Sequence, residues 1–487
     1  MTDTKIGIFL SRVSEKSNLF LLLFFMSIAV AMRLFSFWTS VLDHDESTYM
    51  IIGRDILNGK ALYSDVTDTK PVGIFLFYAG LEFLFGSSIF MKRLVFSLVV
   101  GATAFLIFRI SKRMISQNRV ALASGLIYIF YTSVWNYHGR SPNTELLFNL
   151  CTAGALLLFL KPNFRNYFIG GLILGLGFIV KYLVLFDFLA FMLFFFLLGT
   201  FRTKKIFDGA RLMQHIFAGL AFSIPFLLVN LYFWLGDHFS DFFYVTYQLP
   251  GNYGSNPSLP RYLVMLLDFT AKFLPVSYIV FYVIFSKNKP LLAEDKWFFA
   301  LWIAAVLLAI YIPGKEFSHY TIQLMLPFSL LGGIFFHPEF IKDRFTVKLY
   351  SRKTGWALLA VILITAQVVS FQSDIAEPDY PEEVAGYISE NMEKGDKVYV
   401  SNYEQIIYYL LGIESPTKYV HSNLLFTETH KAFNISASRE IRRIVHTWPR
   451  YVVVYRKNAL VEGLIQKKYH LVKTYRNNEI KIYRRSD

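Results

Sequence analysis

The sequence is dominated by apolar runs that are long enough to cross a lipid bilayer as helices. Such a helix needs about 17–25 mostly apolar residues, and eleven runs of this kind recur along the chain. Hydrophobic residues make up 54% of the 487 residues and charged residues 17%, against roughly 25% charged in a typical soluble domain. An ordinary soluble enzyme, a disordered chain and a fibrous repeat are therefore excluded. The predicted spans lie at 18–40, 92–110, 120–136, 142–160, 167–181, 182–200, 212–235, 262–285, 297–313, 320–336 and 355–371.

Basic residues are distributed unevenly over the segments that join these runs. If the N-terminus is cytoplasmic, the inner segments and span ends hold 21 Lys and Arg residues, and the outer ones hold nine. The positive-inside rule therefore predicts a cytoplasmic N-terminus, and an odd number of spans places the C-terminal segment outside. The net charge of +14 reflects this orientation, so it does not predict a nucleic-acid partner.

The C-terminal part of the chain, residues 372–487, has a different composition. Charges are frequent there, and KVYVS (397–401) and RYVVVYR (450–456) have the length and apolarity of buried strands. The segment EQIIYYLLG predicts a helix closed by Gly412, and HLVKTY, Asn-Asn and IKIYRR predict a terminal hairpin. We therefore expect a membrane domain at 1–371 and a small α/β domain on the outer side.

The first outside loop is too long for a simple connector and has internal order. The stretch ESTYMIIGRDILNG has helical periodicity and ends on Gly59. The stretch VGIFLFYAGLEFLFG (72–86) is apolar but too short to span, so it predicts a helix in the membrane interface. Asp43, Asp45 and Glu46 follow the first span directly, where carboxylates are costly unless a site pairs or uses them.

These features together resemble the GT-C glycosyltransferases. The resemblance is closest to the bacterial branch with protein O-mannosyltransferases, lipid A aminoarabinose transferases and the galacturonosyltransferases of lipopolysaccharide core. It covers most of the chain, although Val72 stands where many relatives have a second proline after Lys-Pro. The matching pieces are Asp45, Glu46 and Tyr49, then Lys70-Pro71, Lys92-Arg93-Leu94, GLILGLGFIVKY (171–182) and KEFSHYTIQLMLPFSLLGG (315–333).

The resemblance implies a polytopic α-helical GT-C fold of about eleven spans, with interfacial helices in the first outside loop and a small C-terminal periplasmic α/β domain. It places the protein in the bacterial inner membrane. It also implies an inverting glycosyltransferase whose donor is a sugar on a polyprenyl phosphate. The acceptor is a hydroxyl of an envelope glycan, a lipid or a protein.

The resemblance also implies roles for individual residues. An acceptor hydroxyl must lose a proton as it attacks, and Asp45, with Glu46 beside it, occupies the position of the catalytic base. Cations stabilise the charge that develops on the leaving phosphate. Lys70, Arg93 and Lys181 also have an ordinary interpretation as basic residues that reach the lipid headgroups, and Arg140 could instead pair with Glu145. The implied phosphate or substrate contacts are Lys70, Arg93, Arg140, Lys181, Tyr49, His319 and Tyr320.

A second acidic position follows the second outside loop. Glu145 lies in the first turn of a predicted helix, where it either complements the helix dipole or serves as the second acidic residue of GT-C enzymes. The cofactor is unknown. A divalent cation is an open option, with Asp45, Glu145 and His319 as ligands of suitable type.

Two other classes of protein compete with the enzyme. A transporter or flippase for lipid-linked sugars concentrates ionisable residues near the bilayer midplane, often with internal symmetry, whereas here the candidates lie at outer span ends and no repeat is visible. A non-catalytic membrane scaffold with an outer binding domain has no need for Asp45, Glu46 and Lys70 together.

Overall fold

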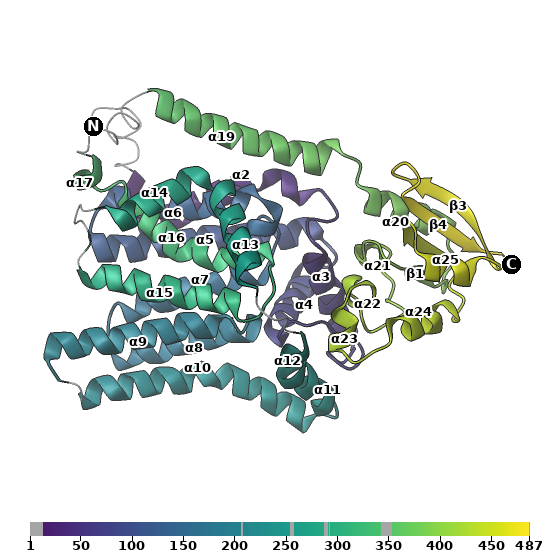
Figure 1. Cartoon of the computed structure of the whole chain (residues 1–487), viewed down its shortest axis with the longest axis horizontal. Coiled ribbons are helices and arrows are strands. Elements are labelled where there is room, and N and C mark those ends of the chain that lie inside the picture. Colours follow the sequence, from purple (N-terminus) through teal and green to yellow (C-terminus); the bar gives the residue numbers. More distant parts are fainter. Residues whose placement is uncertain are drawn as a thin grey trace. The chain divides into compact units, whose positions relative to one another are not determined.

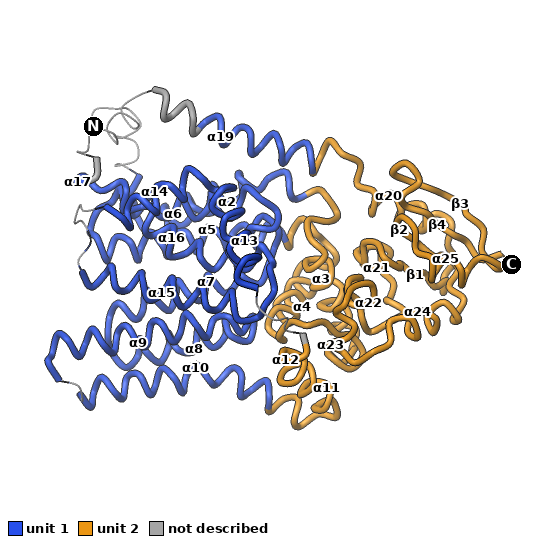
Figure 2. The backbone as a smooth tube through the Cα atoms, in the orientation of Figure 1, with its two compact units in different colours: residues 1–37, 93–230, 256–373 blue, residues 38–92, 231–255, 374–487 orange. Residues whose placement is uncertain are grey.

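The computed structural model describes residues 13–205, 208–253, 258–286, 291, 293–341 and 353–486. The chain forms two compact units, shown in Figure 2. Unit 1 comprises 1–37, 93–230 and 256–373, and unit 2 comprises 38–92, 231–255 and 374–487.

Unit 1 is built from helices that follow the predicted spans closely (Figure 1). Every one of the eleven predicted runs corresponds to a helix or to a pair of helices. The helices are α2 (Asn18–Met32), α5 (Ile89–Ile115), α6 (Asn118–Val134), α7 (Thr144–Phe159), α8 (Phe164–Val180), α9 (Val184–Thr203), α10 (Gly209–Leu235), α13 (Leu259–Lys272), α14 (Leu274–Phe285), α15 (Ala293–Tyr311), α16 (Ile322–Ile334), α17 (Pro338–Ile341) and α19 (Lys353–Phe371), with 3₁₀ turns η1 (Leu34–Phe37), η2 (Asn136–His138) and η4 (Ser318–Thr321).

The protein carries several helices suited to a membrane. Among the described residues, four helices are long and apolar enough to cross one, and a fifth span results if α13 and α14 count together. Other helices at predicted spans, such as α2 and α8, are apolar but shorter. The total of eleven spans therefore stays a prediction. Three of the four long helices are α5 (Ile89–Ile115), α9 (Val184–Thr203) and α10 (Gly209–Leu235). The fourth, Ala360–Asn391, begins within α19 and continues beyond its end.

The predicted span at 262–285 is wrong as one straight helix. The axes of α13 and α14 differ by 105°, and Phe273 between them has φ −112° and ψ 28°. Pro275 lies two residues after Phe273, in the first turn of α14. A proline lacks an N–H group and clashes with the carbonyl four residues earlier, so a helix cannot continue unbroken through this point. The apolar pattern continues across this break, which is why hydropathy alone does not reveal it.

Helices α8 and α10 approach each other along two glycines of the predicted glycine-rich stretch. A Cβ atom at Gly171 would collide with the backbone carbonyl of Ala218, and one at Gly175 would collide with that of Phe222. Small residues four positions apart let membrane helices approach closely, where van der Waals packing provides most of the attraction. These glycines therefore hold α8 against α10.

We expect Gly171→Leu to destabilise unit 1 by about 1–3 kcal/mol or more, because overpacking forces backbone shifts. The matched control is Gly219→Leu on α10, since a Cβ atom there meets nothing within 4 Å. Thermal unfolding of the purified protein in detergent measures both. Equal melting temperatures for the two variants would contradict the close approach of the helices.

Unit 2 combines the first outside loop with the C-terminal residues. The predicted helices of the loop are confirmed as α3 (His44–Leu57) and α4 (Val72–Phe85). The other helices are α11 (Phe239–Phe243), α12 (Leu249–Tyr253), α20 (Tyr380–Asn391), α21 (Ile406–Leu410), α22 (Asn423–Phe426), α23 (Thr429–Ala432), α24 (Ala437–Val445) and α25 (Ala459–Ile465), with π-helical turns η3 (Tyr244–Gln248) and η5 (Gln372–Ala376).

The C-terminal residues form a four-stranded sheet in the order β1-β2-β4-β3. Strands β1 (Val398–Val400) and β2 (Tyr451–Tyr455) are parallel, whereas β3 (Tyr469–Tyr475) and β4 (Ile480–Arg485) form an antiparallel hairpin, with β4 also paired to β2. The predicted strands and hairpin are confirmed. Apolar side chains of α24 and α25, among them Ile441, Ile444 and Ile465, pack in one cluster with β2.

Hydrogen bonds join the first outside loop to the C-terminal segment within unit 2. The Thr67 N–H donates to the Lys418 carbonyl at 2.8 Å, and the Arg54 guanidinium donates to the carbonyls of Tyr408 and Ile413 at 3.0 and 2.8 Å. The sequence divides the chain at residue 371. By packing, however, the first outside loop belongs with the C-terminal residues, and the separate roles of the two predicted domains stay a prediction.

Candidate active site

The first turn of α3 places Asp45 at the positive end of a helix. Asp43 caps the helix, because it has extended backbone geometry and its Oδ1 accepts the Asp45 N–H at 3.2 Å. Such caps satisfy one of the open N–H groups at a helix start, and acids in the first turn complement the helix dipole. The DHDE pattern therefore determines both where α3 begins and where the Asp45 carboxylate lies.

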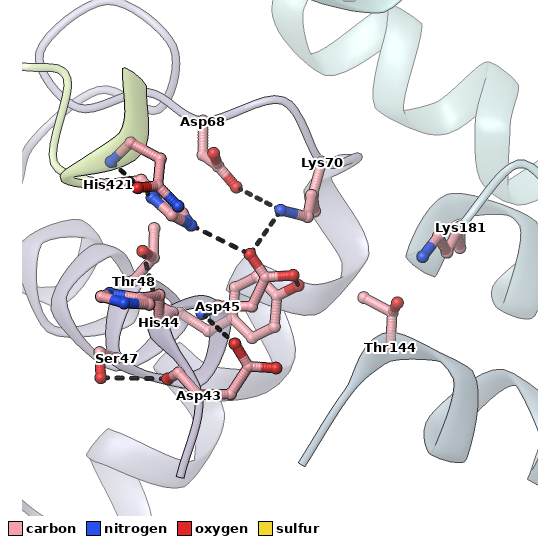
Figure 3. Close-up of polar contacts among 12 residues, drawn as sticks. Asp43, His44, Asp45, Ser47, Thr48, Asp68, Lys70, Thr144, Lys181 and His421 are labelled. Carbon is pink, nitrogen blue, oxygen red and sulfur yellow. Dashed lines mark hydrogen bonds and ion pairs between the residues drawn. The ribbon is translucent and has the colours of Figure 1, made fainter. Parts of the chain in front are cut away.

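The Asp45 carboxylate is the centre of a polar cluster (Figure 3). Its Oδ1 lies 2.8 Å from Lys70 Nζ and 3.2 Å from His421 Nε2. Its Oδ2 accepts the Tyr49 hydroxyl at 3.3 Å. Lys70 also lies 3.3 Å from Asp68. The structure thus brings together the predicted residues Asp45, Tyr49 and Lys70, all within unit 2.

Sequence reasoning did not identify His421. Its Nδ1 accepts the backbone N–H of Asn423 at 3.2 Å, so the hydrogen of a neutral imidazole is on Nε2, which faces Asp45. The ring also stacks on His44, with centroids 5.9 Å apart. A single histidine in a polar stretch carries no spacing signal that links it to Asp45, so only the fold reveals the contact.

Glu46 lies in different surroundings from its neighbour. It is fully buried and interacts electrostatically with Lys92. Lys92 in turn lies 2.8 Å from Glu82 and donates to the Tyr409 hydroxyl at 2.8 Å. Glu46 therefore belongs to a buried ion network that ties α3 and α4 to α21, and its catalytic role stays a prediction.

Unit 1 contains a second polar cluster at the start of α7. Glu145 is fully buried, forms an ion pair with Lys181 and accepts the Thr144 hydroxyl at 2.8 Å. Lys181 Nζ lies 4.2 Å from the centre of the Tyr320 ring, and His319 packs edge-on against that ring at 4.9 Å. Four predicted residues, Glu145, Lys181, His319 and Tyr320, are therefore brought together in this unit.

The two predicted arginines are buried and bonded to neutral groups of unit 1. Arg93 donates to the Ser36 carbonyl at 2.6 Å, and Arg140 donates to the Asn136 side chain. Arg33, which sequence reasoning did not single out, donates to the carbonyls of Thr132, Gly139 and Arg140. The bonds of Arg33 and Arg140 hold the second outside loop in place, and the phosphate contacts of Arg93 and Arg140 stay predictions.

The structure gives no support to a metal site. Within the part of the chain that it describes, no group of three or more His, Cys, Asp or Glu side chains is arranged to hold a metal ion. The option of a divalent cation on Asp45, Glu145 and His319 therefore gains nothing from the geometry. Lys70 and His421 contact Asp45 in unit 2, and a carboxylate with such neighbours is suited to acid–base and electrostatic chemistry.

Comparisons with known proteins identify the fold of the chain. The family model described as dolichyl-phosphate-mannose-protein mannosyltransferase matches residues 69–233. No match to a curated relative reaches significance. The chain is also similar to the crystal structure of ArnT from Cupriavidus metallidurans bound to undecaprenyl phosphate, with a TM-score of 0.61 and 12% identity over 95% of this chain and 97% of that one.

The apo state of the same ArnT gives a TM-score of 0.64 at 12% identity, again over 95% and 97% of the two chains. At this identity the likeness shows the fold. The chain therefore has a GT-C fold of the ArnT and protein-mannosyltransferase type, and the resemblance seen in the sequence is confirmed.

Asp43 gives a pH-dependent test of how the α3 cap is built. Burial, followed by the charge of Asp45, raises the pKa of Asp43 from 3.8 to about 6. Its contribution to stability is fully present below about pH 4 and is lost as the pH rises through 6. Asparagine caps a helix as well as aspartate does, and it carries no charge.

We therefore expect Asp43→Asn to melt higher than the wild type at neutral pH, with a difference that grows between about pH 4 and pH 7. Thermal unfolding across this range measures the difference, with the exposed Asp65→Asn as the matched control. A difference in melting temperature that stays constant with pH would contradict this account, in which burial and the charge of Asp45 disfavour the ionised form of Asp43.

Proposed function

We propose that the protein is an inverting glycosyltransferase that moves a sugar from a polyprenyl-phosphate donor to an acceptor hydroxyl at the outer face of the inner membrane. The observation that carries the proposal is the Asp45 carboxylate held by Lys70 and His421. The shared GT-C fold supports it, since one of the ArnT structures holds undecaprenyl phosphate. The matching family model is that of mannosyltransferases that use a lipid-phosphate donor.

Asp45 acts as the general base in this mechanism. The acceptor oxygen attacks the anomeric carbon while Asp45 takes its proton, and the bond between that carbon and the phosphate oxygen breaks. The phosphate leaves with the bonding electrons, so the anomeric configuration inverts. Lys70 and the Nε2–H of His421 favour the ionised carboxylate, since both stabilise its negative charge. A general base of this kind typically contributes about 10²–10⁴ in rate.

In this proposal Lys70 also stabilises the leaving phosphate. Its ammonium has three N–H donors, and it lies 2.8 Å from Asp45 and 3.3 Å from Asp68. A lipid phosphate beside Asp45 meets the same cation, which stabilises the negative charge of the leaving group. His421 is a positioning residue, because it acts on the Asp45 carboxylate and not on the substrate.

We expect Asp45→Asn to lower the rate of sugar transfer by about 10²–10⁴-fold, because the amide cannot accept the proton. Membrane vesicles supplied with labelled polyprenyl-phosphate sugar measure transfer to endogenous acceptors. The exposed Asp65→Asn in the same loop should transfer at the wild-type rate. Mass spectrometry of envelope glycans from cells with and without the protein identifies the sugar.

Full activity of Asp45→Asn would remove the base assignment. Movement of the labelled lipid across the membrane without transfer would favour a transporter instead. Absence of both activities in the wild type, with partner binding retained, would favour a scaffold.

Variants of the Glu145–Lys181 pair test whether Lys181 only stabilises the fold or also binds a phosphate. Lys181→Met leaves the buried Glu145 carboxylate without its cation, which typically costs about 3–5 kcal/mol. The double variant Lys181→Met/Glu145→Gln has no buried charge at this pair, so we expect most of the stability to return.

If Lys181 binds a phosphate, the double variant should remain about 10²–10³-fold less active in transfer despite its restored melting temperature. Thermal unfolding and the vesicle assay give the two readings. Recovery of activity together with stability would show that the pair only holds unit 1 together.

A further inference from the structure

Unit 2 contains a polar cavity next to the Asp45 cluster. Its volume is about 380 Å³, which lies within the range of about 300–1,000 Å³ typical of small-molecule sites. Residues 402–404, which follow β1, line it together with Ser422, Asn423 and Phe426 at α22. His44, Tyr455 and Arg476 are the other lining residues.

The cavity combines aromatic rings with hydrogen-bonding groups of every kind. The rings of Tyr403 and Tyr455 lie 5.7 Å apart at an interplanar angle of 34°. The Glu404 carboxylate accepts hydrogen bonds and the Arg476 guanidinium donates them, while the Asn423 amide does both. Apolar ring surface with a few convergent polar groups is the usual composition of a small-ligand site.

The lining carries one acidic and one basic side chain, and each lies close to a polar neighbour. Glu404 Oε2 lies 3.1 Å from His44 Nδ1, and Arg476 Nε lies 3.3 Å from Glu479. Burial also raises the pKa of Glu404. With one carboxyl group and one guanidinium group in its lining, the cavity has no excess of either charge that would select a phosphate or a cation. The lining therefore suits an uncharged ligand whose groups both donate and accept hydrogen bonds, as sugar hydroxyls do.

The cavity and the candidate base share two segments of unit 2. His44 lines the cavity, precedes Asp45 in the chain and stacks on His421. His421 contacts Asp45, and the lining residues Ser422 and Asn423 follow it directly. In addition, Gln405 donates to the His44 carbonyl at 2.7 Å and to the Thr48 hydroxyl at 2.9 Å, so the segment that carries Glu404 is fixed to α3.

We propose that this cavity binds an uncharged saccharide unit of the acceptor and holds it beside Asp45, an assignment that rests on the proposed function. The acceptor is then a glycan or a glycolipid. A protein side chain presented by an extended peptide is the alternative that the test must reject.

Saturation-transfer NMR on the full-length protein in lipid nanodiscs tests binding directly. The probes are a panel of uncharged methyl glycosides and disaccharides, with inorganic phosphate and a serine-containing peptide as comparators. We expect saccharide signals in the wild type, none in Asn423→Trp, which fills the cavity, and retained signals in the matched variant Asn391→Trp on α20. Binding of no saccharide, or of only phosphate or peptide, would overturn the proposal.

Kinetics separate this inference from the proposed function. In the transfer assay, Asn423→Ala should raise the KM for the acceptor about three- to tenfold, the value of one lost hydrogen bond, and leave the KM for the donor unchanged. This variant adds no bulk, so it keeps the test valid if Asn423→Trp does not fold. An unchanged acceptor KM in an active enzyme overturns the cavity assignment alone, whereas a wild type without transfer overturns the proposed function.

Discussion

Buried charge governs the polar architecture of both units. An ionised group outside water costs several kcal/mol unless partners replace its hydration. In unit 2 this requirement is met at Asp45 by Lys70 and His421. In unit 1 it is met at Glu145 by Lys181 and at Asp187 by the Trp302 and Gln323 side chains at 2.6 Å each. The partners of these carboxyl groups come from other segments of the same unit.

The same requirement links catalysis to the C-terminal residues in the proposed function. His421 belongs to the C-terminal part of the chain, and Asp45 belongs to the loop after the first helix, yet both lie in one compact unit. A small α/β domain without a role at the site would not need the contact between His421 and Asp45. Its hydrogen bonds to α3 through Gln405 and to the first outside loop through Lys418 indicate that it helps to build the site.

Local patterns predicted a large share of the fold. The α3 helix and its end at Gly59, the strands of RYVVVYR and IKIYRR, and helices at all eleven apolar runs follow from periodicity, caps and turn residues, which act over a few neighbouring positions. The bend at Phe273 was missed because hydropathy is insensitive to a proline inside an apolar run. For the site, the motif residues Asp45, Tyr49 and Lys70 were predicted to belong together and do so, whereas Glu46 was grouped with Asp45 but lies in the network of Lys92.

The sequence by itself determined that this chain is a helical membrane protein with an acidic helix start after the first apolar run and a small α/β C-terminal part. These properties depend on composition, spacing and short motifs, whereas the GT-C fold was implied by the resemblance to a known family. Only the tertiary structure decided which charges meet. The contact of His421 with Asp45, the pairing of Lys181 with Glu145 and the cavity lined by Glu404, Asn423 and Arg476 each join distant segments. Electrostatic and hydrogen-bonding partners are selected by distance in space, and no local pattern encodes that distance.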